Sequence, residues 1–278
     1  MKKKATFRPI YAALFFGAAS LFFISEAAVN ENLDYSFDFI GYGGTFKYNN
    51  LRLFGIPIYY MTILFGLALA VTLCLLGRKK QGMTVTEAVA FPFGVLLVCL
   101  VGGKALYILE NLSSVKKNGV GLDGFSLFGS IFLSVLAAFL ICGFKKDKTA
   151  RLLDRAIFVE LILLASVRTG CFLNGCCGAN TVWVEGRPII LPIQLIEVFF
   201  DLIILDICLK TGDSKGADGR MYPVFLILYS TVRFFLEFSR KTPKDILFLS
   251  NGQVFSLVGI LLGVILYLYF TNKLKKRV

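Results

Sequence analysis

The chain contains no histidine among its 278 residues. Histidine is the usual acid or base near neutral pH and the commonest metal ligand, so other side chains must take such roles. Charged residues are also scarce, at 17% of the chain, against about 25% in soluble proteins. The seven cysteines are odd in number and show no C-x-x-C spacing, which argues against a zinc site and a complete disulfide framework. We therefore expect neither a metal nor a cofactor.

Apolar residues, by contrast, are abundant. They make up 56% of the chain, including 28 phenylalanines, and the mean hydropathy is +0.73. A membrane-spanning helix needs about 20 mostly apolar residues. Continuous runs favour helices over barrel strands, in which polarity alternates. Eight candidate runs lie at Pro9–Ala28, Ile56–Leu76, Ala88–Leu109, Phe125–Gly143, Ala156–Leu173, Pro192–Leu209, Tyr222–Phe238 and Val254–Phe270.

The net charge of +12 is distributed as a topology signal. Basic residues cluster after every second run, in the segments 77–82, 145–155, 210–220 and 272–278. Loops rich in lysine and arginine stay in the cytoplasm, so these segments are predicted to be cytoplasmic loops. A basic chain can also bind nucleic acid, but this distribution between apolar runs predicts a membrane protein with no nucleic-acid partner.

The predicted fold is an all-α integral membrane protein with a seven-helix transmembrane core. Residues 1–28 have a basic start, an apolar stretch and a small-x-small pattern, which fit either a cleaved signal peptide or an extra N-terminal helix. Residues 29–55 are expected to form an external loop, and residues 56–278 the seven-helix domain.

Polar residues recur at helical spacing near the outer end of the run at 222–238. Tyr229, Arg233, Glu237 and Arg240 follow at intervals of four, four and three, which places them on one helix face. A structural ion pair with an anchoring arginine would explain part of this stripe. Four polar residues on one face fit better with a stripe that faces a polar cavity.

Other predicted helices bring polar groups to the same outer end. Arg168 lies near the end of the run at 156–173, and Gln194 and Glu197 lie three residues apart at the start of the next run. Arg168 alone is also explained as an interfacial anchor. A guanidinium binds phosphate through two hydrogen bonds, so several arginines among apolar walls predict a phospholipid-headgroup site. A transporter is an alternative, but we find no internal repeat to support it.

Four motifs, in order and in register, resemble those of the bacterial prolipoprotein diacylglyceryl transferases. The stretch "VRTGCFLNGCCG" at 167–178 is similar to the family's Gly-Arg-x-Gly-Asn/Cys-Phe-x-Asn-Gly hallmark, and "PIQLIE" at 192–197 to its Pro-x-Gln-Leu-Tyr-Glu. "YSTVRFFLEFSR" at 229–240 and "NGQVFS" at 251–256 match two further motifs. The resemblance runs from about residue 54 to the C-terminus.

This resemblance implies an enzyme of the bacterial plasma membrane, with its active site toward the outer face. The family transfers the diacylglyceryl group of phosphatidylglycerol to the lipobox cysteine of lipoprotein precursors, forming a thioether and releasing glycerol phosphate. By resemblance, Arg233 and Glu237 are the catalytic residues, with Arg233 beside the reacting phosphate. The expected substrate-binding residues are Arg168, Asn174, Gln194, Glu197, Tyr229 and Arg240.

The chain departs from the family pattern at five places. Val167 stands where the family has glycine, Met61 with Thr62 where it has tyrosine-glycine, and Lys104 where it has arginine. Phe128 and Leu191 stand where the family has histidine or tyrosine. These changes leave open a divergent member that uses a phospholipid donor with another acceptor, or that only binds the lipid. The cysteines at 171, 176 and 177 allow a disulfide or a purely structural role.

Overall fold

The computed structural model describes residues 52–53, 56–121, 124–173, 181–184, 187–190, 192–212, 219–240, 242 and 248–271. Residues 1–28, most of the expected external loop, and the residues Asn174, Cys176 and Cys177 lie outside this part of the chain. The predictions for them therefore stay predictions.

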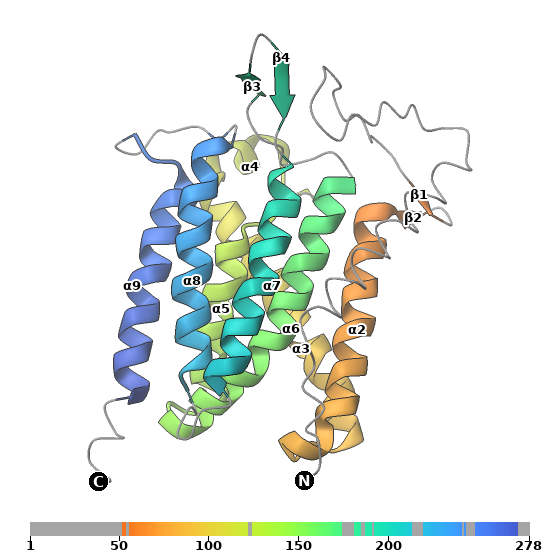
Figure 1. Ribbon diagram of the computed structural model, residues 1–278, viewed down its shortest axis with the longest axis vertical. Helices are drawn as coiled ribbons and strands as arrows, with labels where there is room; N and C mark the ends of the chain where they lie inside the picture. The colour runs from red at the N-terminus through yellow and green to blue at the C-terminus, as the bar shows by residue number, and fades with distance from the viewer. Residues whose placement is uncertain are drawn as a thin grey trace.

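A helix lies on each of the seven runs of the predicted core. The long helices form a bundle with roughly parallel axes (Figure 1). They are α2 (Ile58–Gln81), α3 (Val85–Glu110), α5 (Leu127–Ile141), α6 (Lys146–Leu173), α7 (Ile193–Gly212), α8 (Met221–Leu236) and α9 (Asn251–Thr271). The short helix α4 (Leu112–Asn118) follows α3, and a 3-10 turn, η1 (Glu237–Ser239), follows α8.

Two pairs of short strands lie at one end of the bundle (Figure 1). β1 (Arg52–Leu53) pairs antiparallel with β2 (Ile56–Pro57), and β3 (Thr181–Val184) pairs antiparallel with β4 (Arg187–Ile190). The β3–β4 hairpin joins α6 to α7 and projects from the end of the bundle at which α6 finishes (Figure 1).

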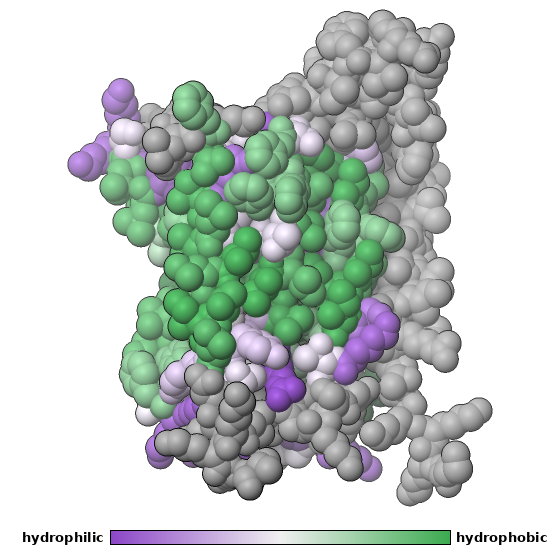
Figure 2. All heavy atoms as spheres, turned by 60° about the vertical axis from the view of Figure 1, so that its left-hand side comes forward, coloured by the Kyte–Doolittle hydropathy of each residue, from purple (hydrophilic) through white to green (hydrophobic). Residues whose placement is uncertain are grey.

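Five helices are long and apolar enough to cross a membrane: α2, α3, α6, α8 with η1, and α9. Helix α5 is shorter, and α7 carries four charged residues. The face drawn in Figure 2 is a continuous apolar band between more polar ends. Such a surface is that of a multi-pass membrane protein.

Helix α6 is the central element of the bundle. In its most apolar stretch 89% of the residues are buried, against 17% for α3. The remaining apolar helices therefore turn one face to the lipid and the other toward α6 or its immediate neighbours. Polar residues near the end of α6 are consequently held inside protein rather than exposed to lipid.

The prediction that residues 145–155 form a loop is wrong, because most of this segment is helical. Helix α6 begins at Lys146, and its charged residues close the ends of neighbouring helices. Asp154 accepts hydrogen bonds from the backbone N–H groups of Gly219 (2.6 Å) and Tyr222 (3.0 Å) at the start of α8. Arg155 donates to the carbonyl of Gln81 at the end of α2 (2.8 Å). Hydropathy places the start of the predicted helix after these charged residues. In the structure the charged residues belong to α6 and form hydrogen bonds with the ends of α2 and α8.

Candidate active site

The predicted polar residues meet at the end of the bundle that carries the β3–β4 hairpin. Arg168 lies near the end of α6, Glu197 in the first turns of α7, and Arg233 in the last turn of α8. Glu237 opens the 3-10 turn η1, and the Arg240 N–H donates to the Glu237 carbonyl (3.2 Å). Because the 3-10 turn η1 ends α8 here, the side chains of Glu237 and Arg240 both stay at this end of the bundle.

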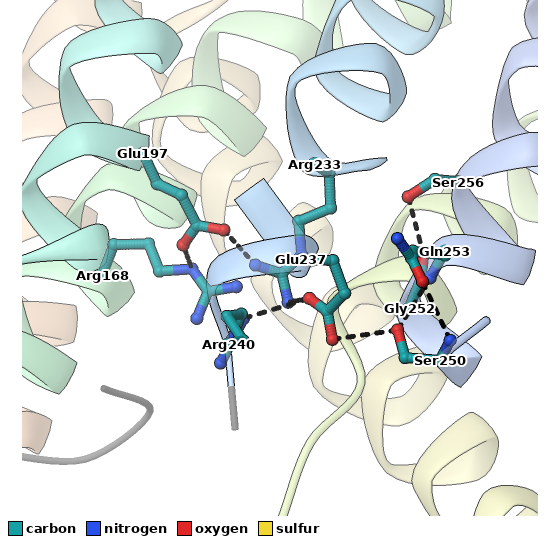
Figure 3. A network of polar contacts seen from close by, with 9 residues as sticks. All are labelled: Arg168, Glu197, Arg233, Glu237, Arg240, Ser250, Gly252, Gln253 and Ser256. Atoms are coloured by element: carbon teal, nitrogen blue, oxygen red, sulfur yellow. Dashed lines mark hydrogen bonds and ion pairs between the residues drawn. The ribbon is translucent and has the colours of Figure 1, made fainter. Parts of the chain in front are cut away.

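Five side chains form one chain of ion pairs, shown in Figure 3. One carboxylate oxygen of Glu197 pairs with Nε of Arg168, and the other with Nη1 of Arg233. Arg233 also pairs with Glu237 through Nη2 (3.0 Å), and Arg240 approaches the same Glu237 oxygen (3.8 Å). We call this set, Arg168–Glu197–Arg233–Glu237–Arg240, the ion-pair chain.

The ion-pair chain is almost fully shielded from solvent. The exposed fraction of its residues lies between 2% for Glu237 and 9% for Arg233. Buried charges are tolerated only when they are paired, and here three arginines face two glutamates. One positive charge within the chain is therefore left for an anion. Burial lowers the pKa of Arg240, and so do the charges of Arg233 and Arg168.

The start of α9 holds Glu237 in place. The hydroxyl of Ser250 donates to Glu237 Oε1 (3.2 Å) and accepts from the N–H of Gln253 (3.2 Å). Gln253 Oε1 in turn accepts from the N–H of Ser250 (3.0 Å), which completes a capping box. Ser250 therefore caps α9. A Cβ on Gly252 would lie 2.8 Å from Glu237 Cδ, so this position needs glycine for the close approach.

Two other predicted residues lie in the same buried region. Gln194 precedes Glu197 by one turn on α7 and is 6% exposed. Tyr229 precedes Arg233 by one turn on α8 and is 4% exposed. The ring of Tyr229 packs against that of Phe128 (6.0 Å between centroids), at the position where the family has histidine or tyrosine.

Lys104, at another position of departure, has a local environment of its own. Its Nζ donates to the carbonyl of Gly124 (3.4 Å) and lies 5.2 Å from the ring centroids of Tyr107 and Phe125. These contacts tie the end of α3 to the segment before α5. Thr62, likewise at a position of departure, donates to the carbonyl of Tyr59 (2.8 Å).

The structure also brings forward residues that the sequence reading missed. Ser250 was not singled out, although a Ser-x-x-Gln pattern precedes an apolar run there. Asp201 was also overlooked; it lies on the same helix face as Glu197, four residues further along α7, and is 3% exposed. The spacing of four from a predicted site residue was the available signal.

Groups that could hold a metal ion, meaning three or more clustered histidine, cysteine, aspartate or glutamate side chains, are absent from the described residues. The functional groups that the described residues bring to the site are guanidinium groups, carboxylates and a hydroxyl. Their arrangement can bind an anion, orient it, and stabilise negative charge that develops on it.

An apolar bundle with a buried arginine–glutamate chain at one end defines a multi-pass membrane protein. The model of one family, "Prolipoprotein diacylglyceryl transferase", matches residues 49–269. The chain belongs to the prolipoprotein diacylglyceryl transferase family, and it is thus a transferase.

Several curated proteins are similar to this chain over most of their length, and each is described as a phosphatidylglycerol–prolipoprotein diacylglyceryl transferase. One from Clostridium perfringens is 29% identical over 246 residues, which cover 81% of this chain and 95% of the relative. One from Clostridium tetani is 24% identical over 235 residues (78% and 94%). One from Campylobacter lari is 27% identical over 274 residues (87% and 97%).

Proposed function

We propose that this chain transfers the diacylglyceryl group of phosphatidylglycerol to the lipobox cysteine thiol of lipoprotein precursors. The products are a thioether-linked lipoprotein precursor and glycerol phosphate. Family membership supports the reaction class. The observation that supports the site is the ion-pair chain, in which three buried arginines face two carboxylates.

In this proposal the lipid phosphate is bound by Arg168, Arg233 and Arg240. Each guanidinium has five N–H donors, and a planar fork suits two phosphate oxygens at once. Glu197 pairs with Arg168 through Nε and with Arg233 through Nη1, so it holds the two guanidinium groups next to each other. The carboxylates orient the arginines before the lipid arrives, which lowers the cost of ordering them on binding.

The arginines also stabilise the leaving group. When the thiol sulfur attacks the glyceryl carbon, the carbon–oxygen bond to the phosphate breaks and its electron pair passes to the phosphate oxygen. Arg233 lies at the centre of the ion-pair chain, between the two glutamates, and is assigned to the oxygen on which charge develops. Glu237, fixed by Ser250, keeps Arg233 and Arg240 aligned.

Gln194, Tyr229 and Asn174 are assigned to the walls of the same site. Gln194 and Tyr229 are buried one turn from Glu197 and Arg233. Asn174 follows α6 in the chain and lies outside the described residues. The five departures from the family pattern leave all members of the ion-pair chain in place, which supports an active transferase over a protein that only binds lipid.

We further propose that all seven long helices cross the bacterial cell membrane and that the site faces its outer side. The basic residues at 145–155, together with Lys210 and Arg220, lie at or near the opposite end of the helices from the ion-pair chain, as a cytoplasmic end requires. Residues 29–55 would then be external, and residues 1–28 would be a cleaved signal or an extra helix.

The experiment that tests this function is complementation. The chain is expressed in bacteria depleted of their own diacylglyceryl transferase, and lipid attachment to a reporter lipoprotein precursor is followed by its mobility and mass. We expect modification by the natural chain, none by Arg233→Ala, and normal modification by Arg151→Ala, which changes an exposed arginine near the start of α6. Absence of modification by the natural chain would reject the proposed activity.

A further inference from the structure

A second polar layer lies one helical turn beyond the ion-pair chain. Asp201 follows Glu197 by four residues on α7, and Tyr229 precedes Arg233 by four residues on α8. The two helices pack together and run in opposite directions, so both steps lead away from the hairpin end (Figure 1). Asp201 and Tyr229 therefore lie at the same depth below the Glu197–Arg233 ion pair.

Both side chains carry a buried oxygen that the described part of the protein leaves without a hydrogen bond. These atoms are Asp201 Oδ2 and the Tyr229 hydroxyl, on residues that are 3% and 4% exposed. A buried polar group without a partner lowers stability, and an apolar residue of similar size would avoid that cost. Ionisable residues at membrane depth are retained mainly where they have a chemical use.

The depth of this layer matches the place of the reacting bond. In the proposed function the lipid phosphate lies at the arginines of the ion-pair chain, and the acyl chains extend toward the centre of the membrane. The glyceryl carbon under attack joins the two, so it lies on the deep side of the arginines. In a displacement the sulfur approaches opposite the leaving oxygen, which brings the thiol toward Asp201 and Tyr229.

Building on the proposed function, we propose that the Asp201 carboxylate is the base that takes the proton of the acceptor thiol, with the Tyr229 hydroxyl beside it. A sulfur–carbon bond forms and the carbon–oxygen bond to phosphate breaks, with the electron pair leaving on the phosphate oxygen. The thiol proton passes to Asp201 and then to the released glycerol phosphate. The carboxylate is thereby restored, and no further reactant is needed.

The other two carboxylates near the site are less suited to this role. Glu197 is held by Arg168 and Arg233, and Glu237 by Arg233, Arg240 and the hydroxyl of Ser250. Guanidinium partners stabilise the charged form of a carboxylate and make it a weak proton acceptor. Asp201 takes part in none of these ion pairs, and a chain without histidine has no imidazole for the task.

The charge balance links proton transfer to donor binding. While no donor lipid is bound, the positive charge that the ion-pair chain leaves over favours the ionised form of Asp201. A bound lipid phosphate brings a further negative charge, so the site then gains by taking up one proton. Binding of the donor thus increases the tendency of Asp201 to accept the thiol proton, and the thiolate forms where its target is present.

The test compares two acceptor peptides on the purified full chain in micelles containing phosphatidylglycerol. One peptide carries a lipobox cysteine and the other carries selenocysteine at the same position. A selenol is ionised at neutral pH and needs no base. Product formation is measured by mass spectrometry for the natural chain, Asp201→Asn, and the control Asp206→Asn, which changes an exposed aspartate paired with Lys210 on the same helix.

We expect Asp201→Asn to lower the rate with cysteine by about 100-fold or more, the usual contribution of a general base. The rate with selenocysteine should fall less than about 10-fold, so the selenocysteine-to-cysteine rate ratio rises. Asp206→Asn should leave both rates unchanged. Asp201→Glu keeps a carboxylate, so its selenocysteine-to-cysteine rate ratio should stay as low as that of the natural chain.

The ratio comes from one preparation, so partial misfolding of a variant does not alter it. A ratio that is the same in Asp201→Asn as in the natural chain would overturn the assignment of the base. So would a ratio that rises equally in Asp201→Glu. If the natural chain modifies neither peptide, the proposed function itself fails, and that outcome is distinct from a failure of the Asp201 assignment.

Discussion

Replacing Glu197 by glutamine removes a carboxylate that pairs with arginines of two different helices. In the natural chain Glu197 pairs with Arg168 of α6 and Arg233 of α8, and all three residues are at most 9% exposed. Arg233 keeps its ion pair with Glu237 after the substitution (3.0 Å), whereas the ion pair between Arg168 and Glu197 is lost. Glutamine has the same shape, so the change tests the charge rather than the packing.

The structure sets the expected size of this effect. Breaking a buried ion pair by removing one partner costs about 3–5 kcal/mol, because a charge is left uncompensated. A chain of this size loses about 2–4 °C of melting temperature per kcal/mol, so we expect a decrease of about 10 °C. Asp206→Asn is the matched control: the exposed Asp206–Lys210 pair should contribute little, at most about 1 kcal/mol.

Lipids provide the decisive arm of this experiment. Melting is followed in detergent with added phosphatidylglycerol or with zwitterionic phosphatidylcholine. The phosphatidylglycerol headgroup has a net negative charge that can replace the missing carboxylate, so it should stabilise Glu197→Gln more than it stabilises the natural chain. Phosphatidylcholine should stabilise both by the same amount. An unchanged melting temperature, or equal gains from the two lipids, would refute the assignment of this cluster as an anion site.

Three further substitutions test parts of the site. Gly252→Ala places a Cβ 2.8 Å from Glu237 Cδ and should cost about 1–3 kcal/mol of stability together with most activity, whereas Gly94→Ala, with nothing within 4 Å, should cost neither. Arg233→Lys keeps the charge but loses the planar fork, so initial rates of diacylglyceryl transfer should fall by about 10-fold or more; an unchanged rate would contradict phosphate binding through two hydrogen bonds. Ser250→Ala removes the α9 cap and a hydrogen bond to Glu237, which should lower the free energy of unfolding by about 1–2 kcal/mol in thermal melts, and a smaller effect would show that the cap is dispensable.

Much of the helix pattern follows from hydropathy, because lipid requires continuous apolar runs. Each core run contains a helix, and five of these helices have the length and composition of a span. The error at 145–155 has a physical origin. Hydropathy treats charge as an end signal, but Asp154 and Arg155 are helical residues that close other helices. Local composition contains no record of such distant partners.

The sequence predicts contacts between site residues of the same helix, but not contacts between residues of different helices. The spacing of Arg233 and Glu237 indicates their pairing, since residues four apart share a helix face. The double pairing of Glu197 depends on how α6, α7 and α8 are rotated against one another, and packing sets that rotation. Asp201 was overlooked because a single acid within an apolar run looks like a tolerated exception until its burial is known.

The sharing of Glu197 by two helices also bears on how such a chain can change over generations. A substitution at position 197 affects two guanidinium groups on separate helices at once, so a compensating change on one helix does not restore the ion pair on the other. Among related chains, positions 168, 197 and 233 should therefore vary as a triplet or not at all. The contact of Arg240 with Glu237 is the longest in the ion-pair chain (3.8 Å) and lies outside this triplet.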